Sequence, residues 1–144
     1  QPFIKDIVEE MEGMVKKKSQ MIHVDFNGPA EVYQDKKILR NILLNLLSNA
    51  VKYSPEGKDI YLEVKEKGEL AIFSVRDEGI GIPEEAQKEL FEKFFRASNA
   101  HAIQGTGLGL NIVKKYVELL GGDIFFESKE NLGSVFTVDI PRVN

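Results

Sequence analysis

The stretch that decides the fold is residues 40–54, which read RNILLNLLSNAVKYS. A run this apolar predicts a helix that is buried on most of its circumference. The i, i+4 spacing places Asn45 and Asn49 on one face of that helix, and Lys52 continues the face. Buried amides are costly without partners. Two carboxamide oxygens followed by an ammonium group suit a hard divalent cation that carries phosphates. Hydrogen bonds to the neighbouring backbone are an alternative explanation for both side chains.

The patterns around this helix predict a single domain, residues 1–144, in which helices and strands alternate. Expected helices cover 2–18, 35–53 with Asp35 as N-cap, 83–90 and 107–120, and expected strands cover 21–26, 31–33, 59–65, 70–77, 123–128 and 134–140. In the first strand, Ile22, Val24 and Phe26 are expected to face inward. These elements predict an α/β (α+β) two-layer sandwich, with a mixed and largely antiparallel sheet packed against about three helices.

Composition excludes several classes of protein. The chain is 42% hydrophobic and 29% charged, carries a net charge of -4 and has no cysteine. The negative charge argues against a nucleic-acid surface, and the short basic run Lys16–Lys18 is expected to be a solvated helix end. No stretch predicts a membrane span or a signal peptide, and the absence of cysteine fits a reducing compartment. We expect a cytoplasmic location without direct membrane contact, whether or not the parent protein is anchored in a membrane. Because the chain begins at Gln1 without a Met, we expect a piece of a longer protein.

The second informative motif begins at Asp77, directly after a strand, and reads DEGIGIP. A carboxylate at this place can accept a hydrogen bond from the exocyclic amine of adenine, whereas guanine would present a carbonyl oxygen. Gly79 and Gly81 would let the backbone approach a flat base, and Ile80 and Ile82 would supply an apolar floor. An ordinary strand-to-helix turn that uses Asp and Gly is the alternative.

A third motif, GTGLGL at residues 105–110, opens the last predicted helix. Glycines at a helix start expose backbone N–H groups, and the positive end of the helix dipole completes an anion site. The motif has no Walker-type Lys-Ser/Thr and does not follow a strand, so it is neither a P-loop nor a Rossmann fingerprint. A hinge for a mobile loop over 97–104 is a second reading, and both can hold.

An aromatic motif, LFEKFFR at residues 90–96, lies between the two glycine motifs. Phe91, Phe94 and Phe95 stand at helical spacing and are expected in the core. Arg96 follows them at the edge of the predicted loop. It is a candidate phosphate clamp, with an ordinary surface arginine as the alternative.

In order and spacing, the four motifs resemble the N, G1, F and G2 boxes of the catalytic ATP-binding domain of sensor histidine kinases. The resemblance covers nearly the whole chain. It implies the Bergerat ATP-binding fold, with a mobile ATP lid from about residue 84 to residue 104. Phe95 stands where that family often has Tyr, which is a mild departure.

The resemblance also implies roles for individual residues. Those implied to bind nucleotide are Asn45, Asn49, Lys52, Tyr53, Asp77, Gly79, Gly81, Ile82, Gly105, Thr106, Gly107, Leu108 and Gly109. Asn49 would ligate Mg2+, Lys52 would contact phosphate, and Tyr53 would lie against the adenine or ribose of ATP. Catalytic contributions would come from Asn45, Lys52 and Arg96, the last of which would reach the γ-phosphate.

The expected acceptor of the phosphate is a separate domain. Related ATPases that activate water, such as type II topoisomerases, carry a Glu one helical turn before the metal-binding Asn, where this chain has Asn45, a poor base. In the histidine kinase family the acceptor is a histidine on a preceding helical hairpin, and neither His23 nor His101 resembles that motif. The implied partners are therefore a dimerisation and histidine-phosphotransfer domain, in cis or in trans, and indirectly a response regulator.

Three alternatives to a histidine kinase domain remain. An ATP-hydrolysing machine of the topoisomerase or mismatch-repair type is disfavoured by Asn45 and by the phenylalanine motif. An anti-sigma-type serine kinase would differ in the residue that it labels. A pseudokinase that only senses nucleotide would bind ATP without transfer, and only measured transfer excludes it.

Overall fold

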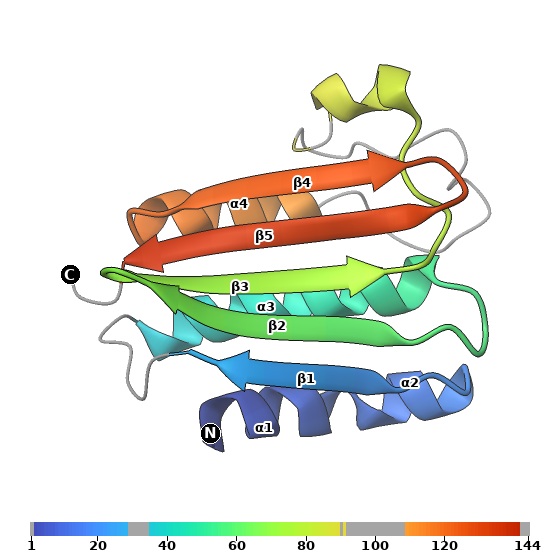
Figure 1. Cartoon of the computed structure of the whole chain (residues 1–144), viewed down its shortest axis with the longest axis horizontal. Helices are drawn as coiled ribbons and strands as arrows, with labels where there is room; N and C mark the ends of the chain where they lie inside the picture. Colours follow the sequence, from blue (N-terminus) through green and yellow to red (C-terminus); the bar gives the residue numbers. More distant parts are fainter. Residues whose placement is uncertain (1, 29–34, 90, 92–108, 142–144) are drawn as a thin grey trace.

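The strands that the structure describes form one sheet, as the computed structural model shows (Figure 1). The structure describes residues 2–28, 35–89, 91 and 109–141. The sheet order is β1-β2-β3-β5-β4, with β1 at Ile22–Asn27, β2 at Ile60–Lys67, β3 at Leu70–Asp77, β4 at Asp123–Lys129 and β5 at Gly133–Pro141. The β1–β2 pair is parallel and the other three pairs are antiparallel. The predicted mixed, largely antiparallel sheet is confirmed.

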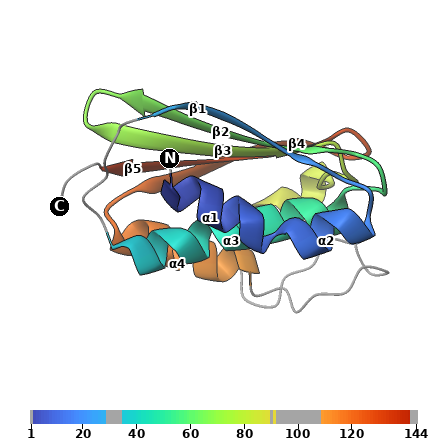
Figure 2. The same ribbon diagram turned by 90° about the horizontal axis from the view of Figure 1, so that it is seen from below.

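The α-helices cover one face of this sheet and leave the other face open (Figure 2). They are α1 at Pro2–Glu10, α2 at Glu12–Lys17, α3 at Lys36–Tyr53 and α4 at Gly109–Leu119, and a 3-10 helix, η1, occupies Glu84–Glu89. The predicted two-layer sandwich is therefore confirmed. In the part of the chain that the structure describes, no helix is long and apolar enough to cross a membrane.

Helix α3 is the centre of the core, as its apolar sequence predicts. The Asp35 carboxylate caps its start by accepting hydrogen bonds from the amides of Lys37 at 2.9 Å and Ile38 at 3.2 Å. Its buried residues are Leu39, Ile42, Leu43, Leu46, Leu47, Ala50 and Val51. They pack against α4 and against the inner face of β2 and β3. The side of α3 that carries the polar residues of the N box is thereby fixed relative to the end of β3.

Helix α4 ends where its two glycines predict. Gly121 adopts a φ of +79° and donates its amide to the Glu118 carbonyl, while the Gly122 amide reaches the Val117 carbonyl at 2.9 Å. This glycine-based C-cap satisfies the last carbonyls of the helix. The chain then turns into β4, and the fully buried Val113 and Val117 hold α4 against the core.

Several predicted elements differ in detail. The helix expected over 2–18 is interrupted at Met11, whose amide bonds the Val8 carbonyl at 3.0 Å in a tightened turn, so α1 and α2 are separate. Val24 faces the helix layer as expected and lines a groove with Ile4 and Val8, but it is 43% exposed because β1 is an edge strand. The helix expected from residue 83 is the 3-10 helix η1. The strand expected at 31–33 lies outside the described residues.

Candidate functional site

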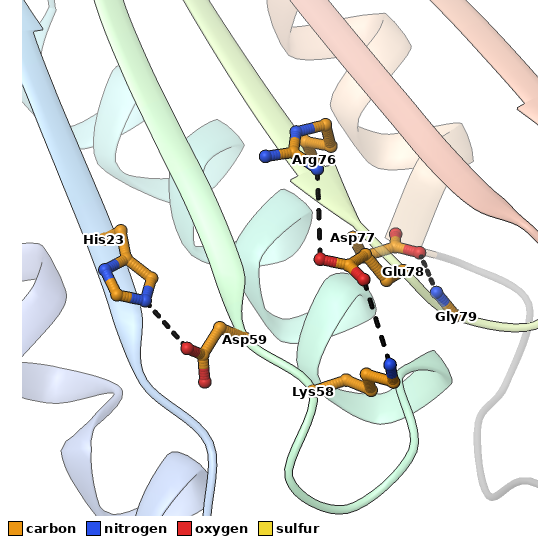
Figure 3. Close-up of polar contacts among 7 residues, drawn as sticks. All are labelled: His23, Lys58, Asp59, Arg76, Asp77, Glu78 and Gly79. Atoms are coloured by element: carbon orange, nitrogen blue, oxygen red, sulfur yellow. Dashed lines mark hydrogen bonds and ion pairs between the residues drawn. The ribbon is translucent and has the colours of Figure 1, made fainter.

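The site is centred on the buried carboxylate of Asp77, the last residue of β3. Because side chains alternate along a strand, Asp77 continues the inward row of Phe73 and Val75, and it is only 8% exposed. One carboxylate oxygen accepts the Gly79 amide at 2.9 Å, as Figure 3 shows. Desolvation raises the pKa of Asp77 to about 6, against hydrogen bonds from the backbone amides of Gly79 and Ser134, which lower it. A buried carboxylate with remaining acceptor capacity is suited to a specific donor.

The glycines after Asp77 are required by the protein's own backbone. A Cβ on Gly79 would lie 2.2 Å from the carbonyl oxygen of Tyr53, so this position joins the G1 segment, residues 77–83, to the end of α3. A Cβ on Gly81 would lie 1.9 Å from the carbonyl oxygen of Lys129, and Gly81 has a φ of +67°. The expected approach of these glycines to a flat base stays a prediction. The observed packing gives an independent reason for glycine at both positions.

The predicted asparagine row is present on α3, although its members are half-buried and not fully buried. The Asn45 side-chain amide donates to the Asn41 carbonyl at 2.8 Å, and the Asn41 amide donates likewise to Lys37. The backbone bond that was an alternative to a ligand role therefore exists for Asn45. Because it uses the amide nitrogen, it leaves the carboxamide oxygen as an acceptor directed away from the helix backbone. No described residue hydrogen-bonds the side chain of Asn49. The two carboxamide oxygens fit a hard cation.

The C-terminal end of α3, which carries Lys52 and Tyr53, is held by residues between α2 and β1. The Lys18 ammonium donates to three carbonyl oxygens of this end: Val51 at 2.6 Å, Lys52 at 3.2 Å and Ser54 at 2.5 Å. Burial lowers the pKa of Lys18 against the nearby charge of Glu56. The expectation of a solvated basic end at Lys16–Lys18 was thus wrong for Lys18, because its ammonium caps a different helix.

Gln20 completes the same junction. Its side-chain amide lies within 3.5 Å of the Val51 carbonyl, 3.3 Å of the Ser54 carbonyl and 3.2 Å of the Pro55 carbonyl. Gln20 is 8% exposed. Sequence signals for this junction were weak, since Gln20 precedes a strand and gives no helical or alternating pattern.

The far side of the G1 segment is closed by the hairpin between β4 and β5. The Asn131 amide bonds the Ile80 carbonyl at 2.6 Å. The Gln87 side chain in η1 donates to two carbonyls, Ile82 and Ser128, each at 3.1 Å. The start of the predicted lid is therefore tied to the same hairpin as the G1 segment. Gln87 carried no signal in the sequence.

The aromatic and second glycine motifs are described only in part. Phe91 packs edge-to-face on Phe126 with ring centroids 5.8 Å apart, which confirms its expected core position, and its carbonyl accepts the Asn111 side-chain amide at 3.1 Å. Gly109 is the first residue of α4. The other predicted residues of these motifs lie outside the described residues: Phe94, Phe95, Arg96, Gly105, Thr106, Gly107 and Leu108.

His23 lies apart from the site, on the open face of the sheet (Figure 3). Its ring bonds the Asp59 carboxylate at 2.8 Å and stacks on Tyr61 with centroids 4.9 Å apart. The Arg76 guanidinium also lies over the Tyr61 ring, 4.0 Å from its centroid, so that His23, Tyr61 and Arg76 form a row of side chains. The hydrogen bond from His23 is the main cause that lowers the pKa of Asp59. This row is a surface feature of three neighbouring strands, on the opposite face from Asp77. His101 lies outside the described residues.

A metal would have to be held by groups other than a carboxylate or histidine cluster in this part of the molecule. Among residues 2–28, 35–89, 91 and 109–141, no three His, Cys, Asp or Glu side chains are grouped closely enough to hold an ion. Among the described residues, the carboxamide oxygens of Asn45 and Asn49 on α3 are of the kind that a hard cation takes as ligands.

The sequence matches proteins of known kind. Residues 34–144 match the family model described as histidine kinase-, DNA gyrase B- and HSP90-like ATPase. The circadian input-output histidine kinase CikA of Synechococcus elongatus is 48% identical over 125 residues, covering 85% of this chain and 17% of that protein. The sensor histidine kinase WalK of Bacillus subtilis is 42% identical over 130 residues, covering 83% of this chain and 21% of WalK. The chain thus spans about a fifth of the length of these relatives.

Solved structures agree with the sequence matches. The catalytic domain of the histidine kinase ThkA superposes with a TM-score of 0.85 at 28% identity, covering 99% of this chain and 94% of the ThkA domain. Full-length ShkA in complex with AMPPNP gives the same TM-score and identity, covering 99% of this chain and 30% of ShkA. Since the family model matches most of the chain and the ThkA catalytic domain superposes on 99% of it, the chain belongs to the family of histidine kinase-, DNA gyrase B- and HSP90-like ATPases and has the fold of a histidine kinase catalytic domain.

Proposed function

We propose that this domain binds ATP with Mg2+ and transfers the γ-phosphate to a histidine on a separate dimerisation domain, as the catalytic part of a sensor histidine kinase. The observation that carries the proposal is the carboxylate of Asp77, which is 8% exposed and oriented by the Gly79 amide at 2.9 Å. The exocyclic amine of adenine is a donor that can satisfy the remaining acceptor capacity of this group. Guanine would direct a carbonyl oxygen at the same carboxylate and be repelled.

The phosphates would lie along the polar face of α3. The carboxamide oxygen of Asn49 would ligate Mg2+, Asn45 would lie beside it near the phosphates, and the exposed Lys52 ammonium would contact a phosphate. Bound Mg2+ supplies charge neutralisation for the developing negative charge of the transferred phosphoryl group. Arg96 and the residues at 105–109 are proposed to complete the phosphate site from the lid side.

The acceptor is proposed to be a histidine outside this chain. In the transfer, the bond between the γ-phosphorus and the bridging oxygen of ATP breaks and a P–N bond to the imidazole forms. ADP leaves with the bridging oxygen, and the imidazole proton is released to solvent. An amide cannot take up a proton from water, so Asn45 offers no base for hydrolysis at the position one turn before Asn49. This favours a nucleophile that is carried by another domain. A response regulator is then the indirect partner of this chain, reached through that domain.

The first experiment is thermal unfolding with AMPPNP and Mg2+. At about a hundred times the dissociation constant, ligand should stabilise the fold by roughly 2.7 kcal/mol. Asp77→Asn should lose this shift, while Asp59→Asn, which removes a carboxylate on the open face of the sheet, should keep it. A shift that survives in Asp77→Asn would contradict the role of Asp77.

The second experiment tests the reaction. The domain is mixed with a histidine hairpin domain from a sensor histidine kinase and with ATP labelled on the γ-phosphate. Acid-labile label on the hairpin domain is expected for a phosphohistidine. Acid-stable label would indicate a serine kinase, and release of free phosphate without labelled protein would indicate an ATPase.

A further inference from the structure

Ser128, the second-last residue of β4, has a side chain that links three separate segments. Its hydroxyl oxygen lies 2.8 Å from the Ile82 amide nitrogen, 3.1 Å from the Gly133 carbonyl oxygen and 2.7 Å from the Ser134 hydroxyl. It is half-buried, and the neighbouring Ser134 is 7% exposed. Both serines occupy inward positions of their strands, where the rows are otherwise apolar.

The directions of these hydrogen bonds follow from the number of protons. Ser128 has one hydroxyl proton, and a carbonyl can only accept, so that proton goes to Gly133. The Ser134 hydroxyl must then donate to Ser128, and the Ile82 amide donates as well. The single donor and both acceptor positions of Ser128 are all used. This hydroxyl therefore acts as a structural junction and has no lone pair left for chemistry.

The junction reaches Asp77 through Ser134. The Ser134 backbone amide hydrogen-bonds the Asp77 carboxylate, while its hydroxyl bonds Ser128. Ser128 in turn holds the Ile82 amide. The segment from Asp77 to Ile82 is therefore held at both ends by the β4–β5 hairpin, and its middle is held by the Asn131 amide on the Ile80 carbonyl.

We propose that the Ser128–Ser134 hydroxyl pair is a positioning device for base recognition, which orients the Asp77 carboxylate and the Gly79–Ile82 segment before nucleotide arrives. This proposal rests on the proposed adenine contact of Asp77. Loss of the Ser128 hydroxyl leaves the Ile82 amide without its partner. The segment can then shift, and the Asp77 carboxylate no longer meets the adenine amine at the right angle.

The test compares two nucleotides that differ where Asp77 would make contact. Inosine triphosphate has an oxygen where ATP has the exocyclic amine, so the ratio of their dissociation constants reports the Asp77 contact, whereas a merely structural defect weakens both alike. In Ser128→Ala, ATP affinity should fall roughly tenfold, which corresponds to the loss of one buried hydrogen bond. The preference for ATP over inosine triphosphate should fall by a similar factor.

Two variants act as controls. Ser74→Ala removes the hydroxyl of a comparable pair, Ser74 with Thr137 at 3.1 Å, on the open face of β3 and β5, and it should keep both affinities. Ser128→Thr keeps the hydroxyl and should restore the preference for ATP. If Ser128→Ala does not fold, Ser134→Ala carries the same test, because it removes the donor to Ser128 but keeps the backbone amide that bonds Asp77.

The outcomes separate this proposal from the one on which it rests. If Asp77→Asn removes the preference for ATP but folded Ser128→Ala and Ser134→Ala keep it, the positioning role is wrong and the adenine contact stands. Equal weakening of ATP and inosine triphosphate in the serine variants would also overturn the positioning role. If Asp77→Asn leaves the preference unchanged, the adenine contact itself is wrong, and the positioning proposal fails with it.

Discussion

The carbonyl oxygen of Tyr53, at the end of α3, accepts a hydrogen bond from the Ile80 amide at 3.1 Å. This bond joins the helix that carries the asparagine row to the segment that follows Asp77. The other carbonyls of the same helix end, those of Val51, Lys52 and Ser54, are taken by Lys18. The two sequence motifs that would face the nucleotide are therefore fixed to each other by the main chain.

The Tyr53–Ile80 contact makes Gly79 a sensitive position. Gly79→Ala would place a Cβ 2.2 Å from the Tyr53 carbonyl oxygen and 3.0 Å from the Asp77 carboxylate. We expect the free energy of unfolding to fall by about 1–3 kcal/mol, as for other overpacked sites, and nucleotide binding to be lost.

Urea unfolding of Gly79→Ala and Gly13→Ala checks this prediction. Gly13 lies in α2 with nothing within 4 Å of an added Cβ, so alanine there should raise stability by up to about 1 kcal/mol. If both variants are stabilised, α3 and the G1 segment are not in tight contact.

Asp77→Asn is expected to stabilise the nucleotide-free protein at neutral pH. Burial raises the pKa of Asp77 from 3.8 to about 6, so folding disfavours its charged form. The contribution of Asp77 to stability is fully present below its unfolded pKa and is lost as pH rises through about 6. The advantage of the variant should therefore be absent below about pH 4 and grow to at most about 3 kcal/mol above pH 6.

Unfolding by urea across this pH range gives the measurement. Asp59→Asn serves as a control of opposite sign, because the hydrogen bond from His23 lowers the pKa of Asp59. The Asp59 charge contributes stability above its unfolded pKa, so that variant should be less stable than wild type at neutral pH, and the difference should shrink as pH falls. A pH-independent advantage for Asp77→Asn would contradict the burial argument.

Lys18→Met is expected to weaken the end of α3. The substitution keeps an unbranched side chain but leaves the carbonyls of Val51, Lys52 and Ser54 without their charged donor. Loss of hydrogen bonds from a charged group should cost about 2 kcal/mol of unfolding free energy. In Lys17→Met, which alters an exposed neighbour, stability should change by less than about 0.5 kcal/mol. Equal midpoints of thermal unfolding for the two variants would show that the contacts of Lys18 do not contribute to stability.

Asn49→Ala is expected to remove the Mg2+ dependence of triphosphate binding. The measurement is the dissociation constant of ATP by calorimetry, with Mg2+ and with a chelator. Wild type should bind more tightly with the metal, and the variant should show one affinity in both. Asn41→Ala is the control, since Asn41 is exposed two turns earlier and its amide bonds only the Lys37 carbonyl. A dependence that persists in Asn49→Ala would move the metal elsewhere.

Helices and strands with a clear hydrophobic period were predictable from the sequence, as were helix ends marked by a capping residue or a glycine. The apolar pattern and Asp35 defined α3, the alternation in 70–77 defined β3, and Gly121 defined the end of α4. These features depend on neighbours within a few residues, so the chain carries their signal locally.

The parts that could not be predicted depend on contacts between distant segments. The Lys18 ammonium reaches carbonyls 33 to 36 residues away, and nothing in its local sequence separates it from a solvated lysine. The partner of Gly79 is a carbonyl of another motif, which a glycine pattern alone cannot name. Ser128 is a polar residue in the same inward row as Ile124 and Phe126. This position becomes informative only when the pairing of β4 with β5 is known.

The strand order gives the protein a constraint during its synthesis. β5 leaves the ribosome after β4, yet it lies between β3 and β4 in the finished sheet. A nascent chain that stops before β5 contains α3, Asp77 and Gly79 but has no strand to bridge β3 to β4, and no Ser134 amide for Asp77. Such a chain already has the asparagines and the carboxylate, and it should still fail to retain nucleotide. If ribosomes are stalled at successive lengths of the chain, nucleotide should be retained only at lengths that allow β5 to insert between β3 and β4.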